Sequence, residues 1–348
     1  MFNIYKVPTG NICVKDGELG KPLEFLSIGD YGKDKNVKAD FLGYTKEING
    51  VPSGDILPLS KKWVTTISTQ YGCSMGCKFC DVPKVGPGIN ATFNDLLMQV
   101  NESIKLHPEV KTTKRFNLHY ARMGEPTWNR NVINSAYYFA KEFKNKKWGF
   151  HPVVSTMLPK GNKDLESYIY DWLKFKNKVA GNAGLQLSIN TTDESIRKDI
   201  MPVSMSLKDI SVMMNKVLNK IGSIKGRKIT LNFAITEAAI DANLLRSLFD
   251  PSYYICKLTP MHKTKSCMSN NLLTKDGYTS FYPYKQIEED LKKEGFGVIV
   301  FVPSFDEDSS LITCGNVILA RKELSDEDIK GENVNKYCGI VNALLKNK

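Results

Sequence analysis

The stretch Gln70-Tyr71-Gly72-Cys73-Ser74-Met75-Gly76-Cys77-Lys78-Phe79-Cys80 places three cysteines in one short loop. Three thiolates in one tight loop can hold three irons of a [4Fe-4S] cube and leave the fourth iron without a protein ligand. Four cysteine ligands saturate such a cluster, whereas an open metal position leaves room for a substrate or cofactor. Cys73, Cys77 and Cys80 are therefore predicted to ligate a [4Fe-4S] cluster that has one open iron.

Two other uses of these cysteines are weaker alternatives. A structural zinc site usually shows paired CxxC or Cys/His spacings, and no such partner follows at zinc-finger distance. A disulfide framework is typical of short secreted chains, whereas this chain has 348 residues and begins without a signal-peptide pattern. Zinc binding and unreactive thiols are the alternatives that this comparison leaves.

The composition limits the compartment and the partners. Eight cysteines without a secretory signal indicate a reducing cytoplasm. The chain has no run of about 18 apolar residues, so no membrane span is expected. Its 48 Lys and Arg against 37 Asp and Glu give a net charge of +11, which favours a polyanionic partner such as RNA or another nucleic acid. A lysine-rich surface without a specific partner is the alternative.

Strand-like and helical patterns alternate from Trp63 onward. Strands separated by helices predict βα units, a parallel sheet and a full or partial barrel whose chemistry lies at the C-terminal strand ends. Thr92-Phe93-Asn94-Asp95 predicts a helix N-cap. The expected strands are 63–70, 115–120, 150–155, 184–189, 228–235, 254–259 and 297–302, and further helices are expected at 131–143, 163–175, 207–221, 242–249 and 284–294.

The alternation also predicts how the chain is divided. We expect an α/β barrel over residues 61–320, preceded by a small β-rich extension over residues 1–60. Residues 321–348 are read as a charged tail.

The cysteine spacing, with Phe79 just before the last cysteine, resembles the radical S-adenosylmethionine (SAM) superfamily. The resemblance implies that the open iron binds the amino and carboxylate groups of SAM. One electron from the cluster then cleaves SAM to a 5′-deoxyadenosyl radical. An electron donor such as flavodoxin or ferredoxin is an implied partner.

Further motifs narrow the resemblance to the RNA adenine-C2 methyltransferases and their adenine-C8 relatives, RlmN and Cfr. By this resemblance we expect a (βα)6 partial barrel in which Gly124, Glu125, Ser155, Ser188 and Asn190 contact SAM. His262 stands where the family usually has asparagine, and Asn190 where it usually has histidine; both retain hydrogen-bonding capacity. The motifs are Met123-Gly124-Glu125-Pro126 with Asn129, Val154–Thr156, Leu187–Asn190, Asp193–Arg197, Pro202, Leu258–His262 and Thr313–Gly315.

Cys314 in the Cys-Gly turn resembles the cysteine that carries the methyl group in this family. There, its thiolate takes a methyl from one SAM, and a second SAM supplies the radical that activates the S-methyl carbon for addition to adenine. A buried hydrophobic role is the alternative for Cys314. The family's second catalytic cysteine is replaced by Thr66, so the two-cysteine cycle requires Cys13, Cys256, Cys267 or Cys338 to reach the site.

Three hypotheses follow from these patterns. The first is an RlmN-like radical SAM methyltransferase that modifies an adenine in RNA through Cys314. The second keeps the radical chemistry but applies it to a different modification of a nucleotide, small molecule or protein, and Thr66 motivates it. The third is a non-catalytic iron–sulfur protein that binds RNA or senses redox state.

Overall fold

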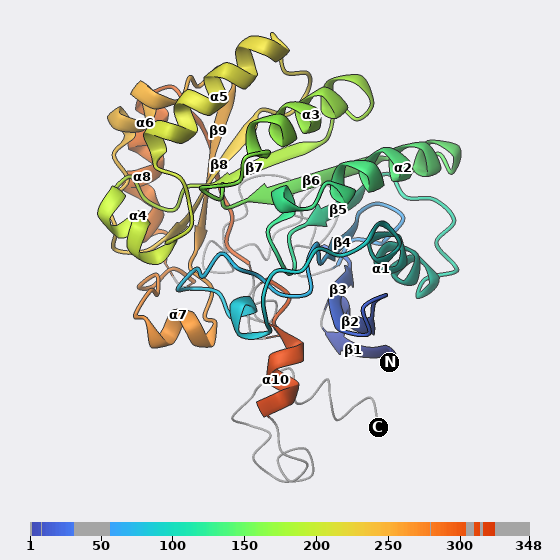
Figure 1. The fold of residues 1–348 in the computed structure, drawn as a ribbon. Helices are drawn as coiled ribbons and strands as arrows, with labels where there is room; N and C mark the ends of the chain where they lie inside the picture. The colour runs from blue at the N-terminus through green and yellow to red at the C-terminus, as the bar shows by residue number, and fades with distance from the viewer. Residues whose placement is uncertain are drawn as a thin grey trace.

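Ten strands form one sheet in the computed structural model, which describes residues 2–7, 9–30, 56–278, 280–303, 310–313 and 316–323. Each strand pairs with its neighbours in sequence, so the order across the sheet is the order along the chain (Figure 1). The strands are β1 Phe2–Val7, β2 Gly10–Asp16, β3 Pro22–Ile28, β4 Trp63–Ile67, β5 Phe116–Tyr120, β6 Phe150–Thr156, β7 Gly184–Ser188, β8 Ile229–Ile235, β9 Tyr254–Pro260 and β10 Gly297–Val300.

The predicted α/β class is confirmed. Strands β4 to β10 pair in parallel, and all seven correspond to strands expected from the sequence. Strand β4 is shorter than expected because the chain leaves the sheet at Ser68. The Ser68 N–H donates to Gln99 Oε1 at 2.8 Å rather than to a neighbouring strand.

The N-terminal strands belong to the same sheet. β1, β2 and β3 pair antiparallel, and β3 joins β4 with Leu26 opposite Thr66. The expectation of short strands before residue 60 therefore holds for residues 2–28. Residues 31–55 of the predicted extension and residues 324–348 of the predicted tail lie outside the described residues.

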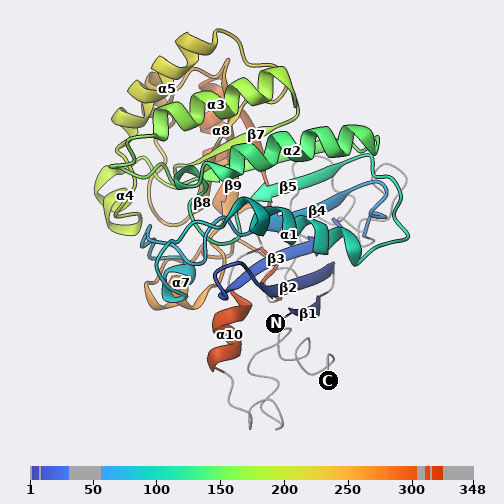
Figure 2. The ribbon, with the colours of Figure 1, turned by 45° about the vertical axis from the view of Figure 1, so that its right-hand side comes forward.

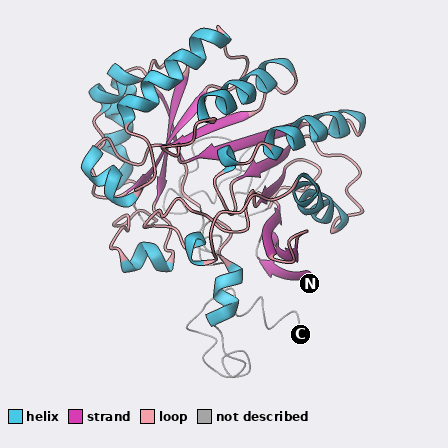
Figure 3. Ribbon diagram, viewed as in Figure 1, coloured by secondary structure: helices cyan, strands magenta, loops and turns pink. Residues whose placement is uncertain are grey.

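Helices cover one face of the parallel strands, as Figures 2 and 3 show. The predicted N-cap is confirmed, because the Thr92 side chain accepts from Asp95 N–H and the Asp95 side chain accepts from Thr92 N–H. No helix in the described ranges is long and apolar enough to cross a membrane. The helices are α1 Phe93–Lys105, α2 Asn131–Asn145, α3 Leu165–Lys178, α4 Glu194–Ile200, α5 Leu207–Ile221, α6 Ala242–Leu248, α7 Lys265–Ser269, α8 Tyr282–Lys293 and α10 Val317–Glu323.

The two faces of the sheet differ in chemistry. Side chains facing the helices are apolar and almost completely buried, as with Phe116, Leu187 and Leu258. Alternate positions point to the opposite side of the sheet, which we call the inner face. Its central residues are only partly buried and mostly polar; they are Thr66, His119, Ser155, Gln186, Asn232 and Lys257.

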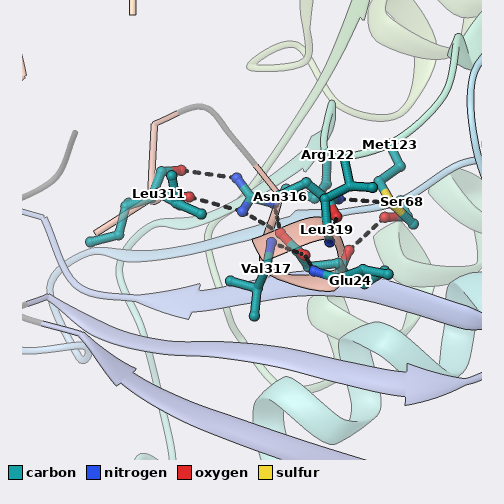
Figure 4. Close-up of polar contacts among 10 residues, drawn as sticks. Glu24, Ser68, Arg122, Met123, Leu311, Asn316, Val317 and Leu319 are labelled. Atoms are coloured by element: carbon teal, nitrogen blue, oxygen red, sulfur yellow. Dashed lines mark hydrogen bonds and ion pairs between the residues drawn. The ribbon is translucent and has the colours of Figure 1, made fainter. Parts of the chain in front are cut away.

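A buried ion pair joins the N-terminal strands, the end of β5 and α10 (Figure 4). Glu24 Oε1 accepts from Nε and Nη2 of Arg122, and both side chains are almost inaccessible to solvent. Arg122 Nη2 also donates to Leu311 O at 2.8 Å. Glu24 Oε2 accepts from Val317 N–H at 2.8 Å, at the start of α10. The pair thus connects three segments that are far apart in the chain.

We predict that Arg122→Met destabilises the fold by about 3–5 kcal/mol, because it leaves the Glu24 carboxylate buried without a cation. The matched control is Arg130→Met, which breaks the exposed ion pair with Asp171 and should cost no more than about 1 kcal/mol. Denaturant unfolding of both variants gives the comparison. Equal losses would mean that the Glu24–Arg122 pair adds nothing beyond a surface contact.

Candidate active site

The three cysteines lie in the loop that follows β4, at the end of the sheet where the parallel strands terminate (Figure 1). Backbone hydrogen bonds hold this loop to two other segments. Cys73 N–H donates to Gly86 O at 3.0 Å, and Lys78 N–H donates to Ile200 O, also at 3.0 Å. The cysteines therefore occupy the position that the sequence predicts for them.

Apolar side chains surround the cysteine loop. Cys77 packs in a buried cluster with Met75, Ile200 and Met201. Burial raises the pKa of the Cys73 thiol to about 11, and burial together with the nearby Cys73 raises the pKa of Cys77 further. Without a bound cation these thiols stay protonated at neutral pH, and metal ligation would release their protons.

Arg197 places a buried cation beside this loop. Its Nη1 donates to the carbonyl oxygens of Ser188 and Ile189, and its Nε donates to Met205 O at 3.2 Å. Its Nη2 is buried and has no hydrogen-bond partner in the described structure. The Arg197 charge also lowers the pKa of Cys77 against the larger effect of burial. A buried donor without an acceptor calls for an anionic partner.

The donor set therefore fits an iron–sulfur cluster. Three thiols come from one loop, their surroundings are apolar, and a buried guanidinium stands beside them. Among the described residues, no three His, Cys, Asp or Glu side chains are arranged to hold a single metal ion.

A second segment, at the start of α7, is hydrogen-bonded to the cysteine loop. No sequence motif pointed to this contact. Asp81, directly after Cys80, accepts from Ser266 N–H at 2.9 Å and from Ser266 Oγ, at the start of α7. Thr264, the N-cap of α7, donates to Phe79 O at 2.7 Å. An acidic residue next to the last cysteine was the available signal, but its partners lie more than 180 residues further along the chain.

Gly124 allows the turn after β5 to approach the cysteine loop. Its φ is +92°, and a Cβ at this position would lie 2.4 Å from Gln70 Cβ and 2.9 Å from Gln70 N. Gln70 Oε1 accepts from Glu125 N–H at 2.9 Å, and Gln70 Nε2 donates to Asn90 Oδ1 at 2.8 Å. Only glycine satisfies both the close contact and the backbone conformation.

The Glu125 carboxylate ties the ends of β5 and β6 together. Its Oε1 accepts from Thr127 N–H, Thr127 Oγ1 and Thr156 Oγ1 at 2.7–3.0 Å. Its Oε2 accepts from Met157 N–H at 2.8 Å. Burial raises the pKa of Glu125, while these donors lower it. The carboxylate therefore has a structural role, and its contact with the amino group of SAM stays a prediction.

The other predicted SAM contacts lie along the same end of the sheet. Ser155 and Ser188 are on the inner face, near the ends of β6 and β7. Asn190 follows β7 with φ +64°, and its Oδ1 accepts from Ala234 N–H while its Nδ2 contacts Met201 Sδ. His262 follows β9, and its Nδ1 lies 3.0 Å from the Tyr278 hydroxyl. The contacts of these residues with SAM stay a prediction.

Neither Cys13 nor Cys256 replaces the missing second cysteine. Thr66 lies on the inner face of β4, opposite His119 in β5. Cys13 and Cys256 are fully buried, and burial raises the pKa of each thiol to about 12. Cys256 alternates with Lys257 in β9 and so points toward the helices. Cys338 lies outside the described residues.

Cys314 and Gly315 also lie outside the described residues, but the flanking segments are held at the end of β5 (Figure 4). Before them, Leu311 O and Ile312 O accept from Arg122. After them, Asn316 Nδ2 contacts Met123 Sδ at 3.2 Å. Both flanks therefore adjoin the residues that lead into the Gly124 turn.

Comparison with solved structures defines the class of fold. A radical SAM methyltransferase from Sphaerobacter thermophilus superposes with a TM-score of 0.60 and 16% identity, over 90% of this chain and 80% of that one. The chain thus has the fold of a radical SAM methyltransferase.

Comparison with curated sequences gives a narrower similarity. The chain is 24% identical over 216 residues to the dual-specificity RNA methyltransferase RlmN of Buchnera aphidicola, covering 59% of this chain and 56% of that protein. It is 23% identical over 201 residues to RlmN of Campylobacter lari, covering 58% and 53%. The chain spans about half the length of these relatives, and no family model matches it. The predicted resemblance to RlmN is confirmed.

We predict that Gly124→Ala prevents normal assembly of the cysteine loop, because the new methyl group collides with Gln70. Iron content and visible absorbance after anaerobic reconstitution should fall several-fold. Gly161→Ala is the matched control, since Gly161 has φ +79° but no atom within 4 Å of its added Cβ. Its strain alone costs about 1 kcal/mol, and its iron content should equal that of the wild type. Equal iron content in both variants would contradict the assigned role of Gly124.

Proposed function

We propose that this chain is a radical SAM enzyme that transfers a one-carbon unit to an adenine of RNA. The observation that carries the proposal is the loop of Cys73, Cys77 and Cys80, packed beside the buried Arg197 at the C-terminal end of a parallel sheet. Its support is the similarity to RlmN proteins over more than half of the chain.

The proposal gives each part of the site a task. The three cysteine thiolates would hold a [4Fe-4S] cluster, which supplies the electron that cleaves SAM to a 5′-deoxyadenosyl radical. The apolar side chains of Met75 and Met201 exclude water from the cysteines. Arg197 offers its unpartnered Nη2 to the negative charge of the ligated loop. Asp81 and Glu125 hold the surrounding loops in position.

Cys314 is proposed as the methyl carrier. Its thiolate would attack the methyl carbon of SAM, so that a sulfur–carbon bond forms as the sulfonium bond breaks and S-adenosylhomocysteine leaves. The thiol proton passes to solvent. The attachment of both flanking segments to Arg122 and Met123 supports this role.

RNA is proposed as the substrate on two grounds. The similar RlmN proteins are named as RNA methyltransferases, and the net charge of +11 favours a polyanion. An electron donor of the flavodoxin or ferredoxin type is proposed as the second partner.

The position of Thr66 favours a second candidate function. Its hydroxyl lies on the inner face, while Cys13 and Cys256 are buried away from that face. An alcohol does not form a disulfide, so release of a cysteine-linked product needs a different step. The second candidate is therefore a radical SAM enzyme that modifies a nucleotide, small molecule or protein without a cysteine carrier.

The test uses anaerobically reconstituted and reduced protein with methyl-deuterated SAM and total RNA. We predict that Cys77→Ser lowers 5′-deoxyadenosine formation more than about 10³-fold, because the cluster loses a ligand. Mass spectrometry of the nucleosides and of the Cys314 peptide should find label on both an adenosine and Cys314 in the wild type.

Cys314→Ala separates the two candidates. It should still cleave SAM but place no label on adenosine, whereas Cys256→Ala, a buried cysteine outside the site, should keep both activities. If Cys314→Ala labels adenosine at the wild-type rate, the carrier role is wrong. If the wild type releases 5′-deoxyadenosine and labels neither site, the second candidate is supported.

A further inference from the structure

A groove with a volume of about 910 Å³ lies among the helices that cover the sheet. Its lining comes from three segments, within residues 159–166, 194–198 and 204–216. The first segment follows the carboxyl end of β6 and leads into α3, and the second belongs to α4, which follows β7. The third leads into α5, which lies beside α3 (Figure 2). The groove is therefore near the end of the sheet that carries the cysteine loop.

Backbone hydrogen bonds join two of the three walls of this groove. Lys160 N–H donates to Val203 O at 2.7 Å, and Met205 N–H donates to Leu158 O at 2.9 Å. The loop after β6 and the loop before α5 therefore run beside each other as a pair. The protein's own hydrogen bonds thus fix the shape of this part of the groove.

Helix α4 connects the groove with the cysteine loop. Arg197 and Lys198 of α4 line the groove. At the end of the same helix, Ile200 O accepts from Lys78 N–H at 3.0 Å, and Asp199 forms an ion pair with Lys78 Nζ at 2.5 Å. Lys78 lies between the second and third cysteines of the loop. A molecule bound in the groove is therefore held beside a helix that contacts the cysteine loop.

The groove carries more positive than negative side chains, and we call it the lysine groove. Its five lysines are all exposed. In the part of the chain that the structure describes, none of their ammonium groups makes a hydrogen bond or an ion pair. The cationic residues are Lys160, Lys163, Arg197, Lys198, Lys208 and Lys216, and the acidic ones are Glu166, Glu194 and Asp209. A groove with an excess of one sign of charge attracts the opposite charge.

Each carboxylate of the lysine groove already has a partner within the protein. The partners are Lys220 Nζ at 2.7 Å for Glu166, Leu207 N–H at 2.5 Å for Glu194 and Ser206 Oγ at 2.7 Å for Asp209. The hydrogen bond from Lys220 lowers the pKa of Glu166, and the charge of Lys216 adds to this effect. The carboxylates are therefore used inside the protein, and the lysines remain available for an anionic ligand.

The residue types of the lysine groove favour the phosphodiester backbone of RNA as this ligand. Among the described residues that line the groove, none is aromatic, so bases find no surface on which to stack. Lysine binds phosphate as a flexible point charge. An acidic protein fits less well, because protein interfaces are rich in aromatic residues and arginine and poor in lysine.

We propose that the lysine groove binds the backbone of the RNA substrate, with Lys163, Lys198 and Lys208 contacting phosphates from its three walls. The proposal rests on RNA being the substrate, as in the proposed function, and adds where the RNA is held outside the cysteine site. Phosphate contacts position an RNA but carry no sequence information. The groove therefore orients the RNA, and the choice of base is made elsewhere.

The test measures equilibrium binding of a labelled RNA hairpin, with an adenine in its loop, to the cluster-loaded protein over a series of salt concentrations. No reductant is added, so no turnover occurs. The groove variant combines Lys163→Gln, Lys198→Gln and Lys208→Gln, which removes one lysine from each wall. We expect it to bind about 10- to 100-fold more weakly at about 0.1 M salt, and the slope of log Kd against log salt to fall by about 2, since each phosphate contact contributes about 0.7–0.9.

The control variant removes the same charge from the other end of the sheet. It combines Lys114→Gln, Lys141→Gln and Lys144→Gln, at exposed positions before β5 and on the second half of α2. Its affinity for the hairpin should change less than about 3-fold, because charges more than about 10 Å from the RNA are screened. An equal loss in both variants would show that only total charge matters, and would overturn the proposal.

Two further outcomes separate the lysine groove from the proposed function. If the wild type binds no RNA, both the groove and RNA as the substrate are wrong. If the groove variant binds RNA normally but binds an acidic flavodoxin more weakly, the groove holds the electron donor and the proposal is overturned. Because only binding is measured, failure of RNA methylation changes none of these results.

A second hairpin, with uridine in place of the loop adenine, tests whether the contacts are to the backbone. The groove variant should weaken binding of both hairpins by the same factor, since phosphate contacts weaken uniformly across sequences. A loss confined to the adenine hairpin would mean that the groove binds the base, and would contradict the proposal.

Lysine acylation of the wild type gives a test that needs no variant. Bound hairpin should protect Lys163, Lys198 and Lys208 from a soluble acylating reagent, as measured by mass spectrometry of the peptides. Lys141, which is exposed on α2, should react at the same rate with and without RNA. Unchanged reactivity of the three groove lysines in the presence of bound RNA would overturn the proposal.

Discussion

The buried ion pair between Glu24 and Arg122 is the interaction on which the arrangement of the active end depends. One carboxylate in β3 receives donors from Arg122 and from the first turn of α10. Arg122 directly precedes Met123 and the Gly124 turn, so its orientation sets where that turn begins. A charged pair in this position is costly to bury. Its directional hydrogen bonds join three distant segments.

Around this contact, the active end is a set of loops held by side chains rather than by regular structure. Gln70 links the cysteine loop to the Gly124 turn, Glu125 links β5 to β6, and Asp81 links the cysteine loop to α7. Each link replaces a backbone hydrogen bond that a loop cannot make with itself. The result is a site whose cysteine loop is positioned by side-chain hydrogen bonds that join it, directly or through Glu125, to three other segments.

The strands and helices were predictable because their signals are local. Alternation and helical spacing located β4 to β10 and most helices, and Thr92 with Asp95 marked the start of α1. The cysteine loop was predictable because its three ligands are adjacent in the sequence. The Glu24–Arg122 pair and the Asp81 contacts were not, because their partners are separated by 98 and 185 residues. The role of Glu125 was predicted only in part. A motif identifies the residue, but it does not show the four donors that hydrogen-bond to its carboxylate.

The order of the sheet has a consequence for synthesis of the protein. Every strand pairs with one made immediately before it, so the sheet can grow by addition as the chain leaves the ribosome. With such sequential pairing, few long loops have to close before the last part of the chain is made. Side-chain contacts between distant segments are exceptions, and that of Glu24 with Val317 spans 293 residues. The segments that flank Cys314 therefore attach last. A nascent chain would have its cysteine loop in place before these flanking segments attach.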